Sequence, residues 1–118
     1  MGGAVAYHAG LAAEEAVARR YVGAGGALAA RRWRGRSGEI DLVVRDRAGN
    51  VVFVEVKHSR SHDEAALHLG AGQLRRICSA AEEFLAGEPA GLATACRIDL
   101  ALVDGQGRIA VIENVFPD

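Results

Sequence analysis

Two runs of alternating apolar and polar residues, separated by a short turn-forming segment, constrain the fold of this chain more than any other feature. Residues 38–45 read GEIDLVVR and residues 51–57 read VVFVEVK. Apolar residues recur at every second position in each run, which is the period of a β-strand. The residues between them, DRAGN, include a glycine and an asparagine, as hairpin loops commonly do. The sequence therefore predicts an antiparallel β-hairpin with one apolar and one charged face.

The simplest register of this hairpin pairs Arg45 with Val51 and places two acidic side chains opposite each other. Counting back along both strands, Asp41 lies across from Glu55. The Cβ atoms of such a pair are about 4.5–5.5 Å apart, and like charges at that distance destabilise a sheet. A divalent cation removes the repulsion, and Mg²⁺ prefers one or two carboxylates together with water and phosphate oxygens. The pattern therefore predicts a site for Mg²⁺ or Mn²⁺ at these two acids.

A lysine accompanies the two acids. Lys57 lies on the same strand face as Glu55, and the same register places it opposite Glu39. An ammonium group at this position could bind a phosphate or stabilise a developing oxyanion. The alternative is purely structural, because Glu39 and Lys57 could form an ion pair on a solvated sheet face. The hairpin alone is compatible with both interpretations.

Length, composition and charge narrow the class of protein. A chain of 118 residues suits a single domain over residues 1–118, in which we expect residues 1–9 to form a loose tail. The net charge of −1 gives no general attraction to nucleic acid, so such binding would need a local basic patch. Cys78 and Cys96 lack metal-ligand spacing and indicate free thiols in a reducing compartment. No run approaches the roughly 18 apolar residues of a spanning helix. We expect a cytoplasmic protein without a membrane partner.

Apolar periodicity predicts the elements around the hairpin. Helices are expected over residues 10–24 and 72–85, and strands over residues 28–33, 97–103 and 108–113. The buried positions of the first helix would be Leu11, Ala18 and Val22, and those of the second Leu74, Ile77, Cys78, Ala81 and Leu85. The order αβββαββ predicts an α/β fold in which helices flank a central sheet.

A cluster of arginines precedes the hairpin. Arg31, Arg32, Arg34 and Arg36 surround Trp33. Arginines beside an aromatic ring suit contact with the phosphates and bases of a nucleic acid. Alternatively, the positive charge could protect an edge strand from pairing with another chain. Trp33 itself suits the core better than a stacking surface.

Several short motifs outside the hairpin carry a family resemblance. They are Glu15-x-x-Ala18-x-x-Tyr21, GEIDL, VFVEVK, Arg97-Ile98-Asp99 and Asn114-Val115-Phe116. From about residue 10 onward this combination resembles the YraN-like family, UPF0102. An acid followed by E-x-K on the next strand resembles the PD-(D/E)xK nuclease-like superfamily. The resemblance implies a restriction-endonuclease-like core with a central mixed β-sheet flanked by helices.

The resemblance also implies a metal site. Asp41, Glu55 and the carbonyl of Val56 would hold Mg²⁺ or Mn²⁺, and Glu15 of the first helix would complete the shell. Glu14 is an open alternative, and either glutamate could instead be a solvated helix residue. Asp99 is interpreted as structural, paired with a neighbouring basic group.

The catalytic residues implied by the resemblance are Asp41, Glu55, Lys57 and Gln73. Gln73 would orient the attacking water or the scissile phosphate, although it could also be an exposed helix residue. The family commonly has a lysine before this glutamine, whereas this chain has Gly72. The loss of that lysine removes one expected phosphate contact.

The predicted function is that of a metal-dependent endonuclease acting on the phosphodiester bonds of nucleic acid, with DNA favoured over RNA. Its nucleic-acid contacts would come from the arginine cluster at residues 31–36 together with Arg60, Arg75 and Arg76. The alternative is a non-catalytic module on the same fold that binds nucleic acid or another protein. A domain of this size could also act as a homodimer.

Overall fold

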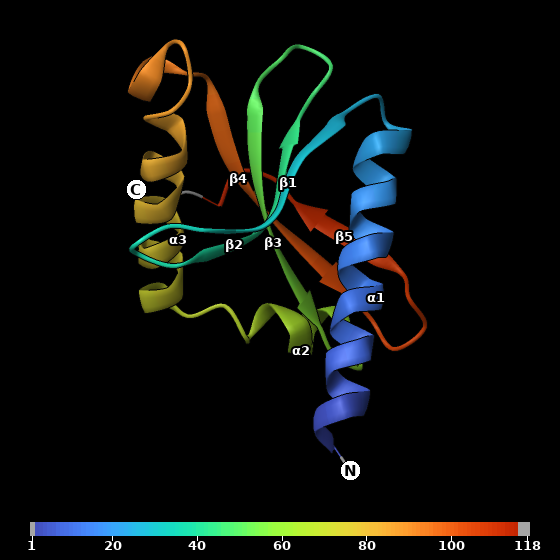
Figure 1. Ribbon diagram of the computed structural model, residues 1–118. Coiled ribbons are helices and arrows are strands. Elements are labelled where there is room, and N and C mark those ends of the chain that lie inside the picture. The colour runs from blue at the N-terminus through green and yellow to red at the C-terminus, as the bar shows by residue number, and fades with distance from the viewer. Residues whose placement is uncertain (1, 116–118) are drawn as a thin grey trace.

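The computed structural model describes residues 2–115, with side chains from residue 9 onward (Figure 1). Its elements are α1 (Gly2–Gly23), β1 (Ala27–Arg34), β2 (Glu39–Arg45), β3 (Val51–His58), α2 (His62–Ala66), α3 (Ala71–Leu85), the 3₁₀ turn η1 (Gly91–Ala93), β4 (Cys96–Val103) and β5 (Ile109–Ile112). The predicted order is confirmed, with α2 and η1 as short additions. Helix α1 begins at Gly2, however, so residues 2–9 are helical where the sequence predicted a tail. The alanines of this segment explain the difference, since alanine has the highest helix propensity.

The five strands form one mixed sheet in the order β1-β2-β3-β4-β5. Strands β3 and β4 are parallel, and the other neighbouring pairs are antiparallel. A parallel pair requires a long crossover connection, which α2 and α3 supply here. Helix α1 covers one face of the sheet and α3 the other (Figure 1). The predicted sheet flanked by helices is therefore confirmed.

Two hydrophobic clusters, one on each face of the sheet, form most of the core. The α1-side cluster contains Ala13, Val17, Ala18, Leu42, Val44, Val52, Val54, Ala101 and Val103. The α3-side cluster contains Ile40, Val43, Val51, Phe53, Ile77, Ala80, Ala81, Leu85 and Ile98. Val43, Val51 and Phe53 are fully buried, so the prediction of one charged hairpin face is wrong over most of its length. The hairpin is an interior part of the sheet, and α3 covers the face that was expected to be solvated.

The two long helices differ in how well their buried stripes were predicted. All five predicted positions of α3 pack in the α3-side cluster, which confirms that stripe. In α1 the buried residues are Ala13, Val17 and Ala18, whereas Val22 is 51% exposed. The prediction for Val22 is therefore wrong. The alanine-rich sequence of α1 offers few large apolar residues to mark its inner face.

An irregularity in β1 and β2 shapes the surroundings of Asp41. The register shift between the two strands falls between Leu28 and Ala30, whereas Arg32 and Asp41 lie between the in-register pairs Arg31–Leu42 and Trp33–Ile40. Arg32 has a φ of 47°, which is uncommon outside glycine. Ile40 packs with the α3-side cluster and Leu42 with the α1-side cluster, although residues two apart share a face in a regular strand. Asp41 therefore lies where the strand changes the face that it buries.

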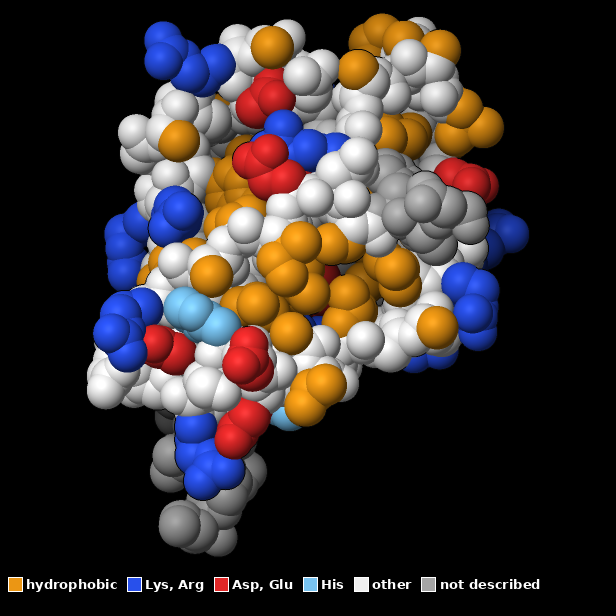
Figure 2. Space-filling view, turned by 180° about the vertical axis from the view of Figure 1, so that it is seen from behind, with side chains coloured by type: hydrophobic (Ala, Val, Ile, Leu, Met, Phe, Trp, Pro, Cys, Tyr) orange, Lys and Arg blue, Asp and Glu red, His pale blue; other side chains and the backbone are white. Residues whose placement is uncertain are grey.

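On one face of the molecule, apolar and basic side chains are unevenly distributed. On the face opposite to that of Figure 1, hydrophobic side chains gather near the centre and most basic side chains lie toward the margins (Figure 2).

None of the helices in residues 2–115 combines the length and the hydropathy that crossing a bilayer requires.

Candidate active site

The predicted hairpin register is confirmed from Arg45 opposite Val51 to Leu42 opposite Val54. The next step of the ladder would place Asp41 opposite Glu55, but the recorded backbone pairing ends before it. Instead, the Asp41 carboxylate accepts a hydrogen bond of 2.8 Å from the backbone N–H of Val56. The negative charge of Asp41 acts on Glu55, whose pKa is raised by burial and by this charge. The structure thus brings together the two acids that the sequence placed side by side.

Glu55 is a buried carboxylate with an incomplete set of partners. The residue is only 4% exposed. Its Oε2 accepts a hydrogen bond of 2.7 Å from Gln73 Nε2 and lies 3.5 Å from Lys57 Nζ. Its Oε1 is buried and has no hydrogen-bond partner in the described part of the chain. Because buried polar atoms are nearly always hydrogen-bonded, this oxygen marks a position where a further group can bind.

The proximity of the two acids changes their protonation. Burial, followed by the negative charge of Asp41, raises the pKa of Glu55 to about 8. Burial also raises the pKa of Asp41, although the Val56 N–H and the Lys57 charge oppose this effect. Two carboxylates in such contact cannot both ionise readily, so they retain a proton unless a cation compensates them.

Lys57 belongs to this site and not to a surface ion pair with Glu39. Its side chain is 17% exposed and directed at Glu55. Glu39 pairs with Arg34 at 2.8 Å instead, so the structural alternative of a Glu39–Lys57 pair is not what forms. Lys57 is also the only lysine in a chain with 13 arginines. Residue 57 is therefore the one position at which the chain has a compact ammonium group and not a planar guanidinium group.

Of the two glutamates in α1, Glu14 is the more buried, and the charge of Asp41 acts on it. Burial raises the pKa of Glu14, and the charges of Asp41 and Glu39 add to this effect. Arg32 holds the Glu14 carboxylate through Nε and Nη2, at 3.1 and 3.0 Å. Glu15 is about half exposed and forms an ion pair with Arg31. Glu14 shares a helix face with Val17 and Ala18, which follow it by three and four positions and are both buried.

Most of the arginines expected to contact nucleic acid are paired with acidic side chains. Arg31 pairs with Glu15, Arg32 with Glu14, Arg34 with Glu39 and Arg60 with Glu64. The backbone N–H of Arg36 donates to Glu83, while its side chain is exposed. Arg75 and Arg76 are exposed on α3, and in residues 2–115 no acidic side chain lies within ion-pair distance of them. These last three side chains are the ones that a phosphate could reach without displacing a carboxylate.

The donor set fits a hard divalent cation. Asp41 and Glu55 supply two carboxylates, and the unpartnered Oε1 of Glu55 is a free acceptor. Mg²⁺ commonly takes one or two protein carboxylates and keeps several waters. Across residues 2–115, no group of three His, Cys, Asp or Glu side chains is arranged to hold a metal. A cation here would therefore rely on two carboxylates, oxygen atoms of the backbone, and water or phosphate.

Comparison with known proteins places this chain in a family. The model of the uncharacterised protein family UPF0102 matches residues 13–103. The chain belongs to UPF0102. It is 60% identical over 116 residues to a UPF0102 protein of Cereibacter sphaeroides strain KD131, with 98% of each chain covered. It is also 56% identical over 108 residues to a UPF0102 protein of Ruegeria pomeroyi, covering 92% of this chain and 87% of that one.

Among solved structures, this UPF0102 chain is similar to a repair endonuclease from Pyrococcus abyssi. The TM-score is 0.51 at 21% sequence identity, and the match covers 85% of this chain but only 39% of the endonuclease. The chain thus corresponds to about two fifths of that protein. The match confirms the restriction-endonuclease-like fold class that the sequence motifs implied.

Proposed function

We propose that this UPF0102 protein is a metal-dependent phosphodiesterase that cleaves nucleic acid at the Asp41–Glu55 site. The observation that carries the proposal is the unpartnered Oε1 of Glu55, buried beside a second acid. A sequence selected only for stability would avoid such an arrangement, because it combines like-charge repulsion with a lost hydrogen bond. The fold similarity to a repair endonuclease supports the same assignment.

The residues around the acids have distinct roles in this proposal. Asp41, Glu55 and the Val56 carbonyl would hold Mg²⁺ or Mn²⁺, which when bound supplies charge stabilisation at the phosphate and lowers the pKa of a coordinated water. Gln73 fixes the orientation of the Glu55 carboxylate through its 2.7 Å hydrogen bond. Lys57 binds a phosphate oxygen and stabilises the charge that develops on it. Glu14 is the proposed third acid in place of Glu15, because it is the more buried of the two and the charge of Asp41 acts on it.

The substrate is proposed to be DNA, bound through exposed arginines. The side chains of Arg36, Arg75 and Arg76 are exposed, and a backbone phosphate could contact them directly. Arg76 also lies close to Gly38, the residue before β2. Because the net charge of the protein is −1, binding would depend on this local patch and weaken steeply with salt.

The test is nuclease activity on single-stranded, duplex and branched DNA and on matched RNA, with Mn²⁺, with Mg²⁺ and with chelator. We expect cleavage only with a divalent ion. Glu55→Gln and Lys57→Ala should each reduce the rate by about a hundredfold or more, in the range seen when one charge-stabilising group is removed. Glu82→Gln, which changes an exposed glutamate of α3 away from the site, is the matched control and should cleave like the wild type.

Two results would contradict the proposal. One is cleavage that persists in Glu55→Gln, which would indicate a contaminating nuclease or another site. The other is the absence of any Mn²⁺ effect on the protein, measured by calorimetry with wild type and Glu55→Gln side by side. Lys57→Arg adds a finer test, since a planar guanidinium should not replace the ammonium group if point contact with a phosphate is required.

A non-catalytic binding module on the same fold is the second candidate. The observation that favours it is the pairing of Arg31, Arg32 and Arg34 with glutamates, which includes the Glu14 that a metal site would use. DNA binding that is unaffected by divalent ions and by Glu55→Gln, with no cleavage of any substrate, would support this function over the enzyme. Loss of binding in a variant with Arg75 and Arg76 changed to glutamine would then place the interface on α3.

A further inference from the structure

A cavity lies on the α1 side of the sheet, and none of its lining residues belongs to the Asp41–Glu55 site. Its volume is about 470 Å³, within the range of small-ligand sites. It is lined by Arg20, Tyr21, Ala24, Gly26, Val44, Asp46, Arg47, Ala48, Arg97, Val111 and Glu113. The lining comes from the end of α1 and the turn after it, from β2 and the β2–β3 loop, from β4, and from β5 with the residue that follows it. In the upper left of Figure 2, the surface is hollowed, and apolar side chains lie recessed there between acidic and basic ones.

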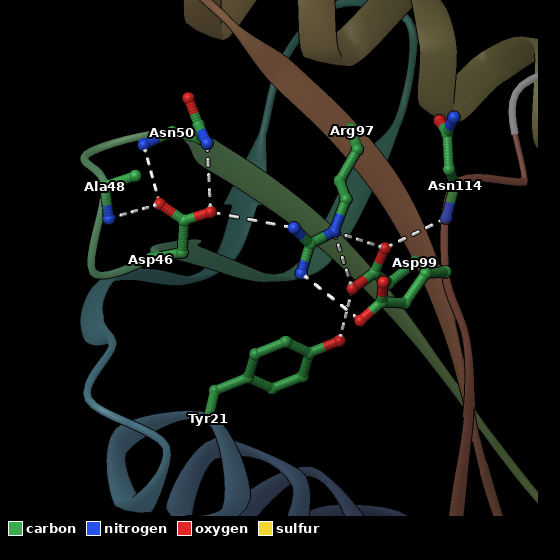
Figure 3. Close-up of polar contacts among 8 residues, drawn as sticks. Tyr21, Asp46, Ala48, Asn50, Arg97, Asp99 and Asn114 are labelled. Carbon is green, nitrogen blue, oxygen red and sulfur yellow. Dashed lines mark hydrogen bonds and ion pairs between the residues drawn. The ribbon is translucent and has the colours of Figure 1, made fainter.

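Arg97 is the oriented cation of this cavity. Its Nε donates to the fully buried Asp99, at 3.0 and 3.2 Å from the two carboxylate oxygens. Asp99 is in turn held by the Tyr21 hydroxyl at 2.7 Å and by the backbone N–H of Asn114 at 3.1 Å (Figure 3). Such a fixed carboxylate sets the plane and direction of the guanidinium group. The planar fork of an arginine in this state is pre-organised to bind a carboxylate or phosphate.

The two terminal nitrogens of Arg97 have weaker partners. Nη1 lies 3.6 Å from Asp46 and Nη2 lies 3.8 Å from Glu113, both beyond hydrogen-bond length. Asp46 cannot move closer easily, because the N–H groups of Ala48 and Asn50 and the Asn50 side chain hold its carboxylate (Figure 3). Glu113 is different, since its side chain is 68% exposed and Arg97 is its one ion-pair partner in the described chain. Its carboxylate can therefore leave Arg97 when another anion arrives.

The remaining walls suit an organic body attached to such an anion. Tyr21, Val44 and Val111 provide an aromatic ring and two branched apolar side chains. Arg47 crosses from the β2–β3 loop to the end of α1, where its side chain lies against Gly25, whose φ of +96° suits glycine. Arg20 and Arg47 add positive charge, so the three arginines of the lining outnumber its two acids.

We propose that this cavity binds a small organic carboxylate or phosphate whose anionic group displaces Glu113 from Arg97 and whose apolar part lies against Tyr21, Val44 and Val111. The exchange replaces one anion by another, so it leaves no charge uncompensated at Arg97. The site shares no residue with the Asp41–Glu55 site and does not depend on the function proposed there.

The test is a titration of isotope-labelled protein followed by amide chemical shifts, with phenyl phosphate, benzoate, inorganic phosphate and benzyl alcohol as probes. We expect saturable shifts at cavity residues with phenyl phosphate or benzoate, and the tighter of the two identifies the preferred anion. Inorganic phosphate and benzyl alcohol, which each lack one half of the recognised chemistry, should bind at least about tenfold more weakly. Equal affinity for either of them and for the tighter aromatic anion would overturn the proposal.

Variants separate a ligand site from a structural network. Arg97→Gln should abolish binding but also removes the partner of Asp99, so two milder changes carry the argument. Arg47→Gln should weaken binding about tenfold, as expected for one lost charged contact, whereas Glu113→Gln should tighten it by removing the competing carboxylate. Arg19→Gln, an exposed arginine of α1 outside the lining, is the control and should leave affinity unchanged. Unchanged or weakened binding in Glu113→Gln would contradict the displacement of this side chain.

Discussion

Glu55 and Asp99 are buried carboxylates on the adjacent parallel strands β3 and β4, and their surroundings differ in kind. Asp99 is fully buried and receives hydrogen bonds from Tyr21, Arg97 and the Asn114 backbone. Glu55 has one satisfied oxygen and one without a partner, and its nearest charged neighbours include another acid. The first arrangement resembles a structural ion pair, in which both carboxylate oxygens accept hydrogen bonds. The second resembles a binding position that is completed by something outside the chain.

This difference teaches how to separate structural from functional acids in a small sheet protein. Burial alone does not distinguish them, because both residues are nearly or fully inaccessible. The number of donors directed at each carboxylate does, since a saturated carboxylate has no capacity left for a cation. The four predictions below test this distinction, beginning with the largest expected effect.

Replacement of Asp99 should destabilise the fold most strongly. Asp99→Asn leaves the Arg97 guanidinium without its buried counter-charge, and loss of one member of a buried pair typically costs about 3–5 kcal/mol. Urea denaturation of wild type and variant would measure the change in the free energy of unfolding. A loss below about 1 kcal/mol would show that Asp99 is not the saturated structural ion pair described here.

Replacement of Glu55 should stabilise the protein in metal-free buffer at high pH, whereas replacement of Asp99 destabilises it. Its pKa is about 8 in the folded protein against 4.5 in the unfolded chain, so the folded state holds the extra proton between these values. Stability should then fall as pH rises through that window, by up to about 1.4 kcal/mol per pH unit. Glu55→Gln, which cannot ionise, should lose this slope and exceed the wild type in stability near pH 8.

The measurement is urea denaturation of both proteins at pH 5, 6, 7 and 8 with chelator present. The difference between the two curves isolates the Asp41–Glu55 pair, because the other titrating groups are common to both proteins. Addition of Mn²⁺ should restore wild-type stability at pH 8 and leave Glu55→Gln unaffected. Parallel curves for the two proteins over the whole range would show that the raised pKa of Glu55 does not exist.

Features that depend on residues close together in the sequence could be predicted from it. The register of Arg45 with Val51, and with it the meeting of Asp41 and Glu55, follows from alternation and loop length alone. The stripe of α3 follows from its strong 3.6-residue periodicity. Asp99 beside Arg97 was also recognisable as a structural pair, because the two residues lie on the same face of one strand.

Features that depend on packing between distant elements could not be predicted in the same way. The choice between Glu14 and Glu15 depends on the rotation of α1 against the sheet, and an alanine-rich helix carries little information on that rotation. β2 changes the face that it buries between Ile40 and Leu42, and a period-two pattern has no means of indicating this change. The position of Arg47 in the wall of the cavity around Arg97 likewise depends on how the β2–β3 loop meets the end of α1.

Tyr21→Phe tests the hydrogen bonding of Asp99 with a smaller change, because it removes one of the donors to this carboxylate. The phenol hydroxyl donates to Asp99 at 2.7 Å, and a hydrogen bond to a charged group contributes about 1.5–3 kcal/mol. We expect a loss of stability near the lower end of that range, because the Arg97 and Asn114 donors remain. Thermal and urea denaturation would measure it. No loss at all would mean that the tyrosine only packs against the α1-side cluster and that Asp99 depends on fewer donors.

The smallest expected effect concerns the pair between Arg34 and Glu39, beside the acidic site but outside it. Arg34 is 78% exposed, and exposed ion pairs contribute about 0.2–1 kcal/mol. Arg34→Gln should therefore change the free energy of unfolding by less than about 1 kcal/mol, and raised salt should reduce the difference further. Denaturation at low and high ionic strength would measure both effects. A larger loss that persists in high salt would show that Glu39 is part of the buried acidic group, which would then contain a third carboxylate in need of a cation.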